Sequence, residues 1–192
     1  MPMDDPAVFV DRDGTLNEEV GHLNAAGELE LIDGAAEAVR LLRASGYKVV
    51  VVTNQAAVAR GLLSEEGLRE IHARLEQRLR AEGAGLDGIY YCPHHPTEGR
   101  GVYRIECSCR KPKPGLVERA ATELDINLAR SFLVGDKLSD LEAGAAAGCK
   151  GILVRTGYGV ESEQEIGEAP VPPEHVANDL LDASRWILRQ GA

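Results

Sequence analysis

The sequence predicts an α/β fold, a three-layer, Rossmann-like parallel sheet with helices on both faces. Short apolar runs of strand length alternate along the chain with longer segments of helical periodicity, which is the order of parallel strands joined by right-handed helical crossovers. The apolar runs are also continuous, as expected for strands that are buried on both faces. With 192 residues, 44% of them hydrophobic and 27% charged, the chain is long enough for a substantial core, and we expect one domain over residues 1–192.

Five apolar runs are predicted to be strands. Ser64 is a predicted N-cap, because the segment after it places Leu68, Ile71, Leu75 and Leu79 on one helical face. Gly46 ends an earlier helix, and Pro114 begins a later one as its first residue. The predicted strands span 8–10, 47–53, 87–92, 131–136 and 151–156, the predicted helices span 34–46, 64–83, 114–124, 138–148 and 179–189, and 168–175 is predicted to be a surface loop.

Charge and hydropathy exclude several classes of partner. The net charge of −10 argues against nucleic acid or an anionic membrane as the main partner. The longest apolar runs are too short to span a bilayer, and the N-terminal segment carries acidic residues where a signal peptide would carry lysine or arginine. We therefore expect a cytoplasmic monomer whose partner is a small molecule.

Polar side chains stand at the ends of four predicted strands. Asp11 and Asp13 follow the first predicted strand, and Thr53 and Asn54 stand at the end of the second. Asp136 ends the fourth, and Arg155 and Thr156 end the fifth. Ligands of open α/β sheets bind at the carboxyl ends of the strands, so these groups should share one crevice. Carboxylates placed so close together repel one another unless a cation lies among them, and their hard oxygen atoms suit Mg²⁺.

Each of these segments also has a simpler interpretation. Asp13-Gly14 is a common turn dipeptide, and taken alone it supports a turn as well as it supports chemistry. An EF-hand loop is excluded, because Gly14 directly follows the second aspartate and His22 occupies the position of the required glutamate. The segment 144–151 has the wrong glycine spacing for a phosphate-binding P-loop and no Ser or Thr after its lysine.

Four segments together, "DRDGT", "TN", the lysine of "RKP" and "GDKLSD", resemble the motifs of the haloacid dehalogenase (HAD) superfamily of phosphatases. The resemblance covers nearly the whole chain and implies an HAD-type sheet. It implies that Asp11 is the nucleophile, forming an aspartyl phosphate, and that Asp13 is the general acid and then the general base. It further implies that Thr53 and Asn54 hold the transferring phosphoryl group and that Lys111 neutralises its charge.

The resemblance also implies a metal site and a set of substrate contacts. Mg²⁺ would bind the side chains of Asp11 and Asp136 and the backbone carbonyl of Asp13, with Asp140 close by but not a ligand. Too few residues separate the motifs for a large cap domain, so loops should shape a pocket with a minimal cap. Ala56 and Ala57 replace the Ser-Gly pair of many relatives, which removes a hydroxyl contact. The expected substrate-binding residues are Asn54, Gln55, Arg110, Lys137, Glu19 and His22.

A second metal site is predicted in the segment 92–109, "CPHHPTEGRGVYRIECSC". Three of the four cysteines lie there, and a chain without a secretion signal should keep them reduced, which argues against a disulfide. Cys92, His94, Cys107 and Cys109 form a closed Cys₃His set typical of structural Zn²⁺, with His95 as the rival to His94. This zinc-stabilised loop would position Arg110 and Lys111 over the active site. Cys149 and His72 are predicted to be structural.

Two branches of the superfamily share such a zinc loop, namely phosphatases acting on a heptose 1,7-bisphosphate and histidinol phosphatases. Twelve residues separate His94 from Cys107, which resembles the longer loop of the heptose branch. The segments 21–35 and 87–96 resemble that branch as well. The expected activity is Mg²⁺-dependent hydrolysis of the 7-phosphate in lipopolysaccharide precursor synthesis. Histidinol-phosphate hydrolysis is the alternative, and a non-catalytic phosphate-binding regulator on the same scaffold is a third possibility.

Overall fold

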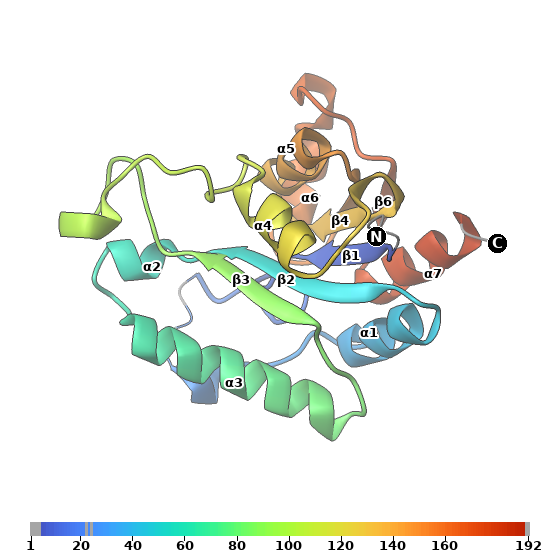
Figure 1. The fold of residues 1–192 in the computed structure, drawn as a ribbon, viewed down its shortest axis with the longest axis horizontal. Helices are drawn as coiled ribbons and strands as arrows, with labels where there is room; N and C mark the ends of the chain where they lie inside the picture. The colour runs from blue at the N-terminus through green and yellow to red at the C-terminus, as the bar shows by residue number, and fades with distance from the viewer. Residues whose placement is uncertain (1–4, 22, 24, 191–192) are drawn as a thin grey trace.

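The computed structural model describes residues 5–21, 23 and 25–190. At its centre is a six-stranded sheet in the order β3-β2-β1-β4-β5-β6, in which every neighbouring pair is parallel (Figure 1). The predicted α/β class is therefore confirmed. The strands are β1 (Ala7–Val10), β2 (Lys48–Asn54), β3 (Gly88–Cys92), β4 (Phe132–Gly135), β5 (Lys150–Val154) and β6 (His175–Ala177).

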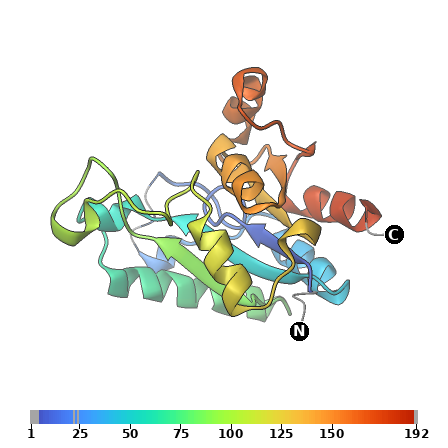
Figure 2. The same ribbon diagram turned by 45° about the horizontal axis from the view of Figure 1, so that its top comes forward.

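Helices cover both faces of the sheet, which gives the three predicted layers (Figures 1 and 2). One face is covered by α1, α3 and α7, and the opposite face by α4 and α5. The helices of the described chain are α1 (Ala35–Ala44), α2 (Ala56–Ala59), α3 (Glu65–Ala81), α4 (Gly115–Glu123), α5 (Leu138–Ala147), α6 (Gly159–Gln164) and α7 (Leu180–Gln190). None of these helices combines the length and the apolar content needed to cross a membrane.

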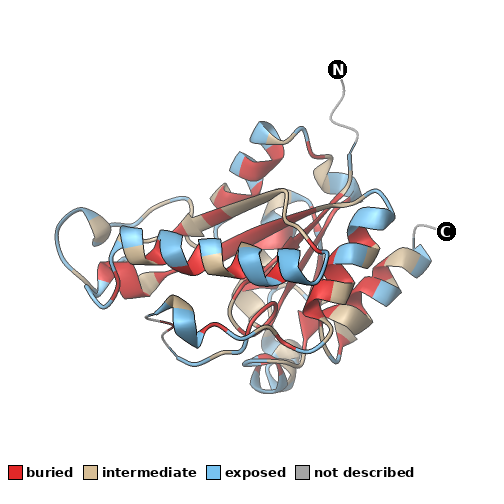
Figure 3. Ribbon diagram, turned by 90° about the horizontal axis from the view of Figure 1, so that it is seen from below, coloured by how far each residue is buried: buried red, intermediate tan, exposed pale blue. Residues whose placement is uncertain are grey.

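The alternation of β1 side chains divides the core into two halves. Val8 and Val10 pack with α1, α3 and α7, whereas Ala7 and Phe9 pack with α4 and α5. All four residues are fully buried, as a strand flanked by helices on both sides requires (Figure 3). The continuous apolar run in the sequence reflects this double burial.

Most predicted elements are confirmed to within a few residues. In α3 the Ser64 hydroxyl accepts a hydrogen bond from the Gly67 amide at 3.0 Å, and the four residues predicted to share a face are all fully buried. Pro114 is the N-cap residue of α4 and not its first helical residue.

Three short elements were missing from the prediction. The predicted loop 168–175 overlaps the start of β6, a three-residue edge strand that pairs only with β5. The helices α2 and α6 were not predicted either. All three elements are too short to show a hydrophobic period, so only their contacts with the rest of the fold reveal them.

The strand order determines where a ligand can bind. The chain runs outward from β1 to β2 and β3, and then crosses back to β4 on the other side of β1. Crevices of doubly wound sheets open at such a reversal, beyond the carboxyl ends of the strands. Asp11 follows β1 and Asp136 follows β4, so both lie at this reversal.

Candidate functional site

A cavity of about 460 Å³ opens at the carboxyl ends of β1 and β2. It brings together most of the residues that the sequence predicts for the active site. The side chains that line it include Asp11, Asp13, Glu19, Thr53, Asn54, Gln55, Arg110, Lys111, Lys137 and Asp140. His22, a predicted substrate contact, lies outside the described residues.

Lys111 is a buried cation between two carboxylates. Its Nζ lies 2.8 Å from Asp11 Oδ1 and 2.6 Å from Asp140 Oδ1, and it donates a hydrogen bond to the Val52 carbonyl at 2.8 Å. Burial alone would lower the pKa of Lys111, but the charges of Asp11 and Asp140 outweigh it and raise the pKa. The ammonium group therefore stays charged beside the predicted nucleophile.

The amide of Asn54 fixes the main chain of this lysine. Asn54 Nδ2 donates to the Lys111 carbonyl, and Asn54 Oδ1 accepts from the Lys111 amide, both at 3.0 Å. Because the nitrogen and the oxygen of its side-chain amide both form hydrogen bonds to the Lys111 main chain, Asn54 holds Lys111 in place. The sequence alone did not predict this role. The contact of Asn54 with a phosphoryl group stays a prediction.

Asp13 is held by three side chains. Arg12 donates hydrogen bonds to its carboxylate from Nε and Nη2 at 2.8–3.0 Å. Asn17 Nδ2 donates to the same carboxylate at 3.0 Å, and Gln55 Nε2 at 2.9 Å. Burial would raise the pKa of Asp13, but Arg12, Asn17 and Gln55 together lower it. Gln55 Nε2 also donates to Thr53 Oγ1 at 2.8 Å, so Gln55 links two predicted catalytic residues.

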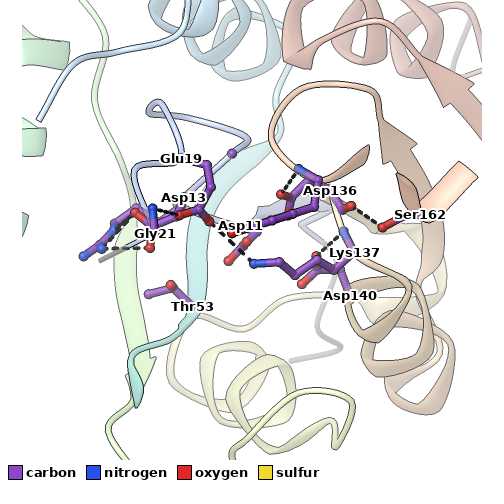
Figure 4. A network of polar contacts seen from close by, with 12 residues as sticks. Asp11, Asp13, Glu19, Gly21, Thr53, Asp136, Lys137, Asp140 and Ser162 are labelled. Carbon is purple, nitrogen blue, oxygen red and sulfur yellow. Dashed lines mark hydrogen bonds and ion pairs between the residues drawn. The ribbon is translucent and has the colours of Figure 1, made fainter. Parts of the chain in front are cut away.

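Three carboxylates converge beside Asp13, as Figure 4 shows for Asp11, Asp136 and Asp140. One oxygen from each lies within 4.8 Å of the others. Burial, followed by the charges of the other two aspartates, raises the pKa of Asp136 to about 7, and burial raises that of Asp11 to about 6. Asp136 Oδ1 is buried without a hydrogen-bond partner. This donor set fits a hard divalent cation such as Mg²⁺.

Each of these carboxylates has a different set of partners. Asp136 Oδ2 accepts from the Tyr158 amide at 2.8 Å, while Asp140 pairs with Lys111 through one oxygen and accepts from the Lys137 amide at 3.1 Å through the other. Asp140 thus orients Lys111, and its position beside the metal site without being a ligand stays a prediction. Gly14, at φ +80°, leaves the space for the Asp136 carboxylate that a Cβ would fill.

Three predicted substrate contacts form the rim of the cavity. Lys137 Nζ lies 3.6 Å from Glu19 Oε2, and Glu19 Oε1 accepts from the Gly21 amide at 2.7 Å. Arg110 Nη1 donates to the carbonyl of His94 at 3.1 Å. Two cationic side chains, Arg110 and Lys137, therefore line the cavity outside the carboxylate cluster.

The second cluster is formed by Cys92, His94, Cys107 and Cys109, whose ligand atoms lie within 4.8 Å of one another. The three sulfur atoms are 3.1–3.5 Å apart, much longer than a disulfide bond, and all four cysteines are free. His94 Nδ1 lies 3.5 Å from Cys109 Sγ, whereas His95 Nδ1 accepts the Glu98 amide instead. The cluster fits a structural Zn²⁺, and His94 is the member that the prediction favoured over His95.

The zinc loop is fastened to α3. The Glu65 carboxylate, at the first turn of α3, accepts hydrogen bonds from Tyr91 on β3 and Tyr103 in the loop, each at 2.8 Å. The Arg60–Glu98 ion pair ties the loop to the end of α2. Through the contact of Arg110 with His94, this loop is linked directly to the cavity.

We predict one Zn²⁺ per chain at the Cys92–Cys109 cluster. Cys107→Ser should abolish zinc binding and lower the melting temperature, because structural zinc contributes to folding. Elemental analysis and thermal unfolding of protein purified without added metal measure both effects. Cys149→Ala, which removes a thiol outside the cluster, should retain the zinc, and an unchanged metal content in Cys107→Ser contradicts the assignment.

We also predict that Mg²⁺ binding releases protons near neutral pH. The pKa values of about 6 for Asp11 and about 7 for Asp136 mean that these carboxyls are partly protonated without metal, whereas a metal binds their ionised form. Affinity should therefore fall as the pH is lowered from 8 to 5.5, with roughly one proton released at pH 6.5. Titration calorimetry in buffers of different ionisation enthalpy measures this release, and a binding enthalpy that does not vary with buffer contradicts it.

Comparison with known proteins connects this geometry to a family. Residues 108–183 match the family model described as HAD-hydrolase-like. A D-glycero-beta-D-manno-heptose-1,7-bisphosphate 7-phosphatase of Haemophilus influenzae is 43% identical over 184 residues, covering 95% of this chain and 97% of the relative. The enzyme of the same name from Escherichia coli K12 is 41% identical over 187 residues, covering 96% and 95%.

A solved structure shows the same likeness. The crystal structure of D,D-heptose 1,7-bisphosphate phosphatase from B. bronchiseptica, complexed with magnesium and phosphate, aligns with a TM-score of 0.85 and 33% identity. The alignment covers 96% of this chain and 99% of that chain. The resemblance to HAD phosphatases is thus confirmed, and the chain belongs to the heptose-1,7-bisphosphate 7-phosphatase family of HAD-like hydrolases.

Proposed function

We propose that this protein is a Mg²⁺-dependent phosphatase that removes the 7-phosphate of D-glycero-beta-D-manno-heptose 1,7-bisphosphate through an aspartyl phosphate. The observation that carries the proposal is the arrangement of Asp11, with Lys111 at 2.8 Å and Asp13 at the edge of the same cavity. The names of the relatives supply the substrate and its beta configuration. A non-catalytic regulator would not need this complete set of groups.

The residues of the site divide the reaction between them. Asp11 attacks the phosphorus atom, and Asp13 donates a proton to the departing sugar oxygen. Asp13 then takes a proton from the water that hydrolyses the aspartyl phosphate. Lys111 and Thr53 are placed to neutralise and hold the equatorial phosphoryl oxygens. When Mg²⁺ is bound by Asp11, Asp136 and the Asp13 carbonyl, it supplies further charge neutralisation.

The partners of Asp13 suit its second task, in which it acts as a base toward water. Its carboxylate lies against Arg12, which favours the ionised form in the resting protein. To act first as the acid, Asp13 must take up a proton when the negatively charged substrate binds, because added negative charge nearby raises the pKa of a carboxyl. The hydrogen bonds from Asn17 and Gln55 hold the carboxyl in a fixed orientation for both steps.

The rim of the cavity suits a substrate with a second phosphate. Arg110 and Lys137 lie on its wall and can neutralise an anion away from the reacting centre. Histidinol phosphate carries an amine and an imidazole in place of a second phosphate, and would bring a cation to this basic rim. Glu19 is the one carboxylate there that could meet such a cation, and it is paired with Lys137.

The thiols and the net charge also bear on the compartment and the partners of the protein. We propose that it acts in the cytoplasm as a monomer with a single domain, without nucleic acid or membrane partners. The reduced thiols of the zinc cluster suit a reducing compartment, and the net charge of −10 disfavours anionic polymers and lipids.

Asp11→Asn is predicted to reduce phosphate release to below about 1% of the wild-type rate, since removal of a catalytic nucleophile causes very large losses. The fold should be retained, because Asp140 still pairs with Lys111. Phosphate release and circular dichroism measure the two effects, with the exposed Asp33→Asn as the matched control. Retention of more than a few per cent of the activity would remove Asp11 from its assigned role.

The substrate preference is predicted to favour the bisphosphate. We expect kcat/KM for the heptose 1,7-bisphosphate to exceed that for histidinol phosphate at least about tenfold, a difference of about 1.4 kcal/mol in transition-state binding. Arg110→Ala should lower the ratio of the two kcat/KM values, because the 1-phosphate of the bisphosphate then has one positively charged partner fewer. The reverse preference in side-by-side kinetics would assign the protein to the histidinol phosphatase branch instead.

A further inference from the structure

Three side chains around Asp13 each have a buried polar atom without a hydrogen-bond partner. The atoms are Nη1 of Arg12, Nε2 of His72 and Oδ1 of Asn17, and the first two are a matching donor and acceptor. Arg12 is 1% exposed and His72 is 8% exposed, so water in bulk does not satisfy either atom. Buried polar groups without a hydrogen-bond partner are uncommon in folded proteins. A donor on Arg12 and an acceptor on His72, both near Asp13, therefore suggest that one bridging group satisfies both.

The guanidinium of Arg12 is only partly used by Asp13. Its Nε and Nη2 both donate to the Asp13 carboxylate, and Nη1 is the remaining nitrogen. Because a guanidinium is rigid and planar, an acceptor on Nη1 would fix the plane in which the other two nitrogens meet Asp13. Without such an acceptor, the plane is held from the Asp13 side alone.

His72 provides an acceptor of the right kind. It lies in the middle of α3, on the face packed against the sheet, with its ring 5.6 Å from that of Tyr91. Burial, together with the nearby positive charge of Arg12, lowers the pKa of His72 to about 3, although Asp13 opposes the shift. The ring is therefore neutral at physiological pH, and in the tautomer protonated at Nδ1 its Nε2 can accept a hydrogen bond.

We propose that His72 is a positioning residue for the catalytic acid: one water molecule accepts a hydrogen bond from Arg12 Nη1 and donates one to His72 Nε2, and this bridge fixes the guanidinium that orients Asp13. This inference rests on the proposed function, in which Asp13 protonates the leaving group. The helix α3, which carries His72, lies outside the four HAD motifs and would in this way help to orient a catalytic residue. Asn17 Oδ1, also buried without a partner, is the competing acceptor for the same group.

The test uses the dependence of catalysis on the leaving group. A sugar phosphate releases a poor alkoxide that needs a proton from Asp13, whereas 2,4-dinitrophenyl phosphate releases a phenolate that needs none. Comparing kcat/KM for the two substrates isolates the step in which the leaving group departs. A displaced Asp13 should therefore slow the sugar phosphate selectively, and a merely structural defect should slow both substrates equally.

His72→Leu removes the acceptor at similar volume, and His72→Gln retains an acceptor near the position of Nε2. We expect His72→Leu to lower kcat/KM for the heptose bisphosphate by about 10- to 100-fold and that for the aryl phosphate by less than about threefold. His72→Gln should recover most of the loss. Leu75→Ala, on the same helix and fully buried, is the control for destabilisation and should leave the ratio of the two substrates unchanged.

A double-mutant cycle tests the path through Arg12. If His72 acts through Arg12, His72→Leu should add little to the loss already caused by Arg12→Gln. This comparison and the Gln variant keep the proposal testable if His72→Leu folds poorly.

Two results would overturn the proposal. One is an equal loss, or no loss, on both substrates in His72→Leu. The other is full additivity in the double-mutant cycle, which would mean that His72 does not act through Arg12. Either result would count against His72 without touching the proposed function. The Asp13→Asn variant tests that function separately: if it loses no more activity on the sugar phosphate than on the aryl phosphate, Asp13 is not the general acid.

Discussion

The site depends on the convergence of buried carboxylates at one point above the sheet. Asp11, Asp136 and Asp140 meet there because β1 and β4 are neighbours and parallel, and burial makes the repulsion between their charges costly. Lys111 offsets part of that charge from within the protein. A divalent cation bound among these carboxylates would offset the rest, and the same positive charges would then suit a phosphoryl group in transfer.

The zinc loop supports this arrangement from the side. It ends at Cys109, two residues before Lys111, and its ligand His94 holds Arg110 through a backbone carbonyl. Asn54 then fixes the Lys111 main chain to the end of β2. A structural metal bound by the Cys92–Cys109 cluster would therefore order a loop whose following residues carry positive charge into the cavity.

The carboxylate of Asp13 is oriented by a different cation. Arg12 is buried and not turned toward solvent, and its Nε and Nη2 both donate to Asp13. The cost of burying a guanidinium is offset by this bidentate pair. The two carboxylates of "DRD" thus have separate cationic partners, Lys111 for Asp11 and Arg12 for Asp13. Burial raises the pKa of Asp11 although Lys111 opposes it, whereas Arg12, Asn17 and Gln55 outweigh burial and lower the pKa of Asp13.

The sequence by itself determined the layers, the five longer strands, and both clusters of ligating side chains, because these depend on local pattern. Strand ends carry Asp11, Asp13 and Asp136, and the four zinc ligands lie within eighteen residues. Only the tertiary structure decided what Arg12, Asn54 and Asp140 do. Their partners are selected by side-chain direction in the folded core, and, for Asn54 and Lys111, across a separation of 57 residues. The edge strand β6 likewise forms because it pairs with β5. Three residues are too few for the sequence to predict this pairing.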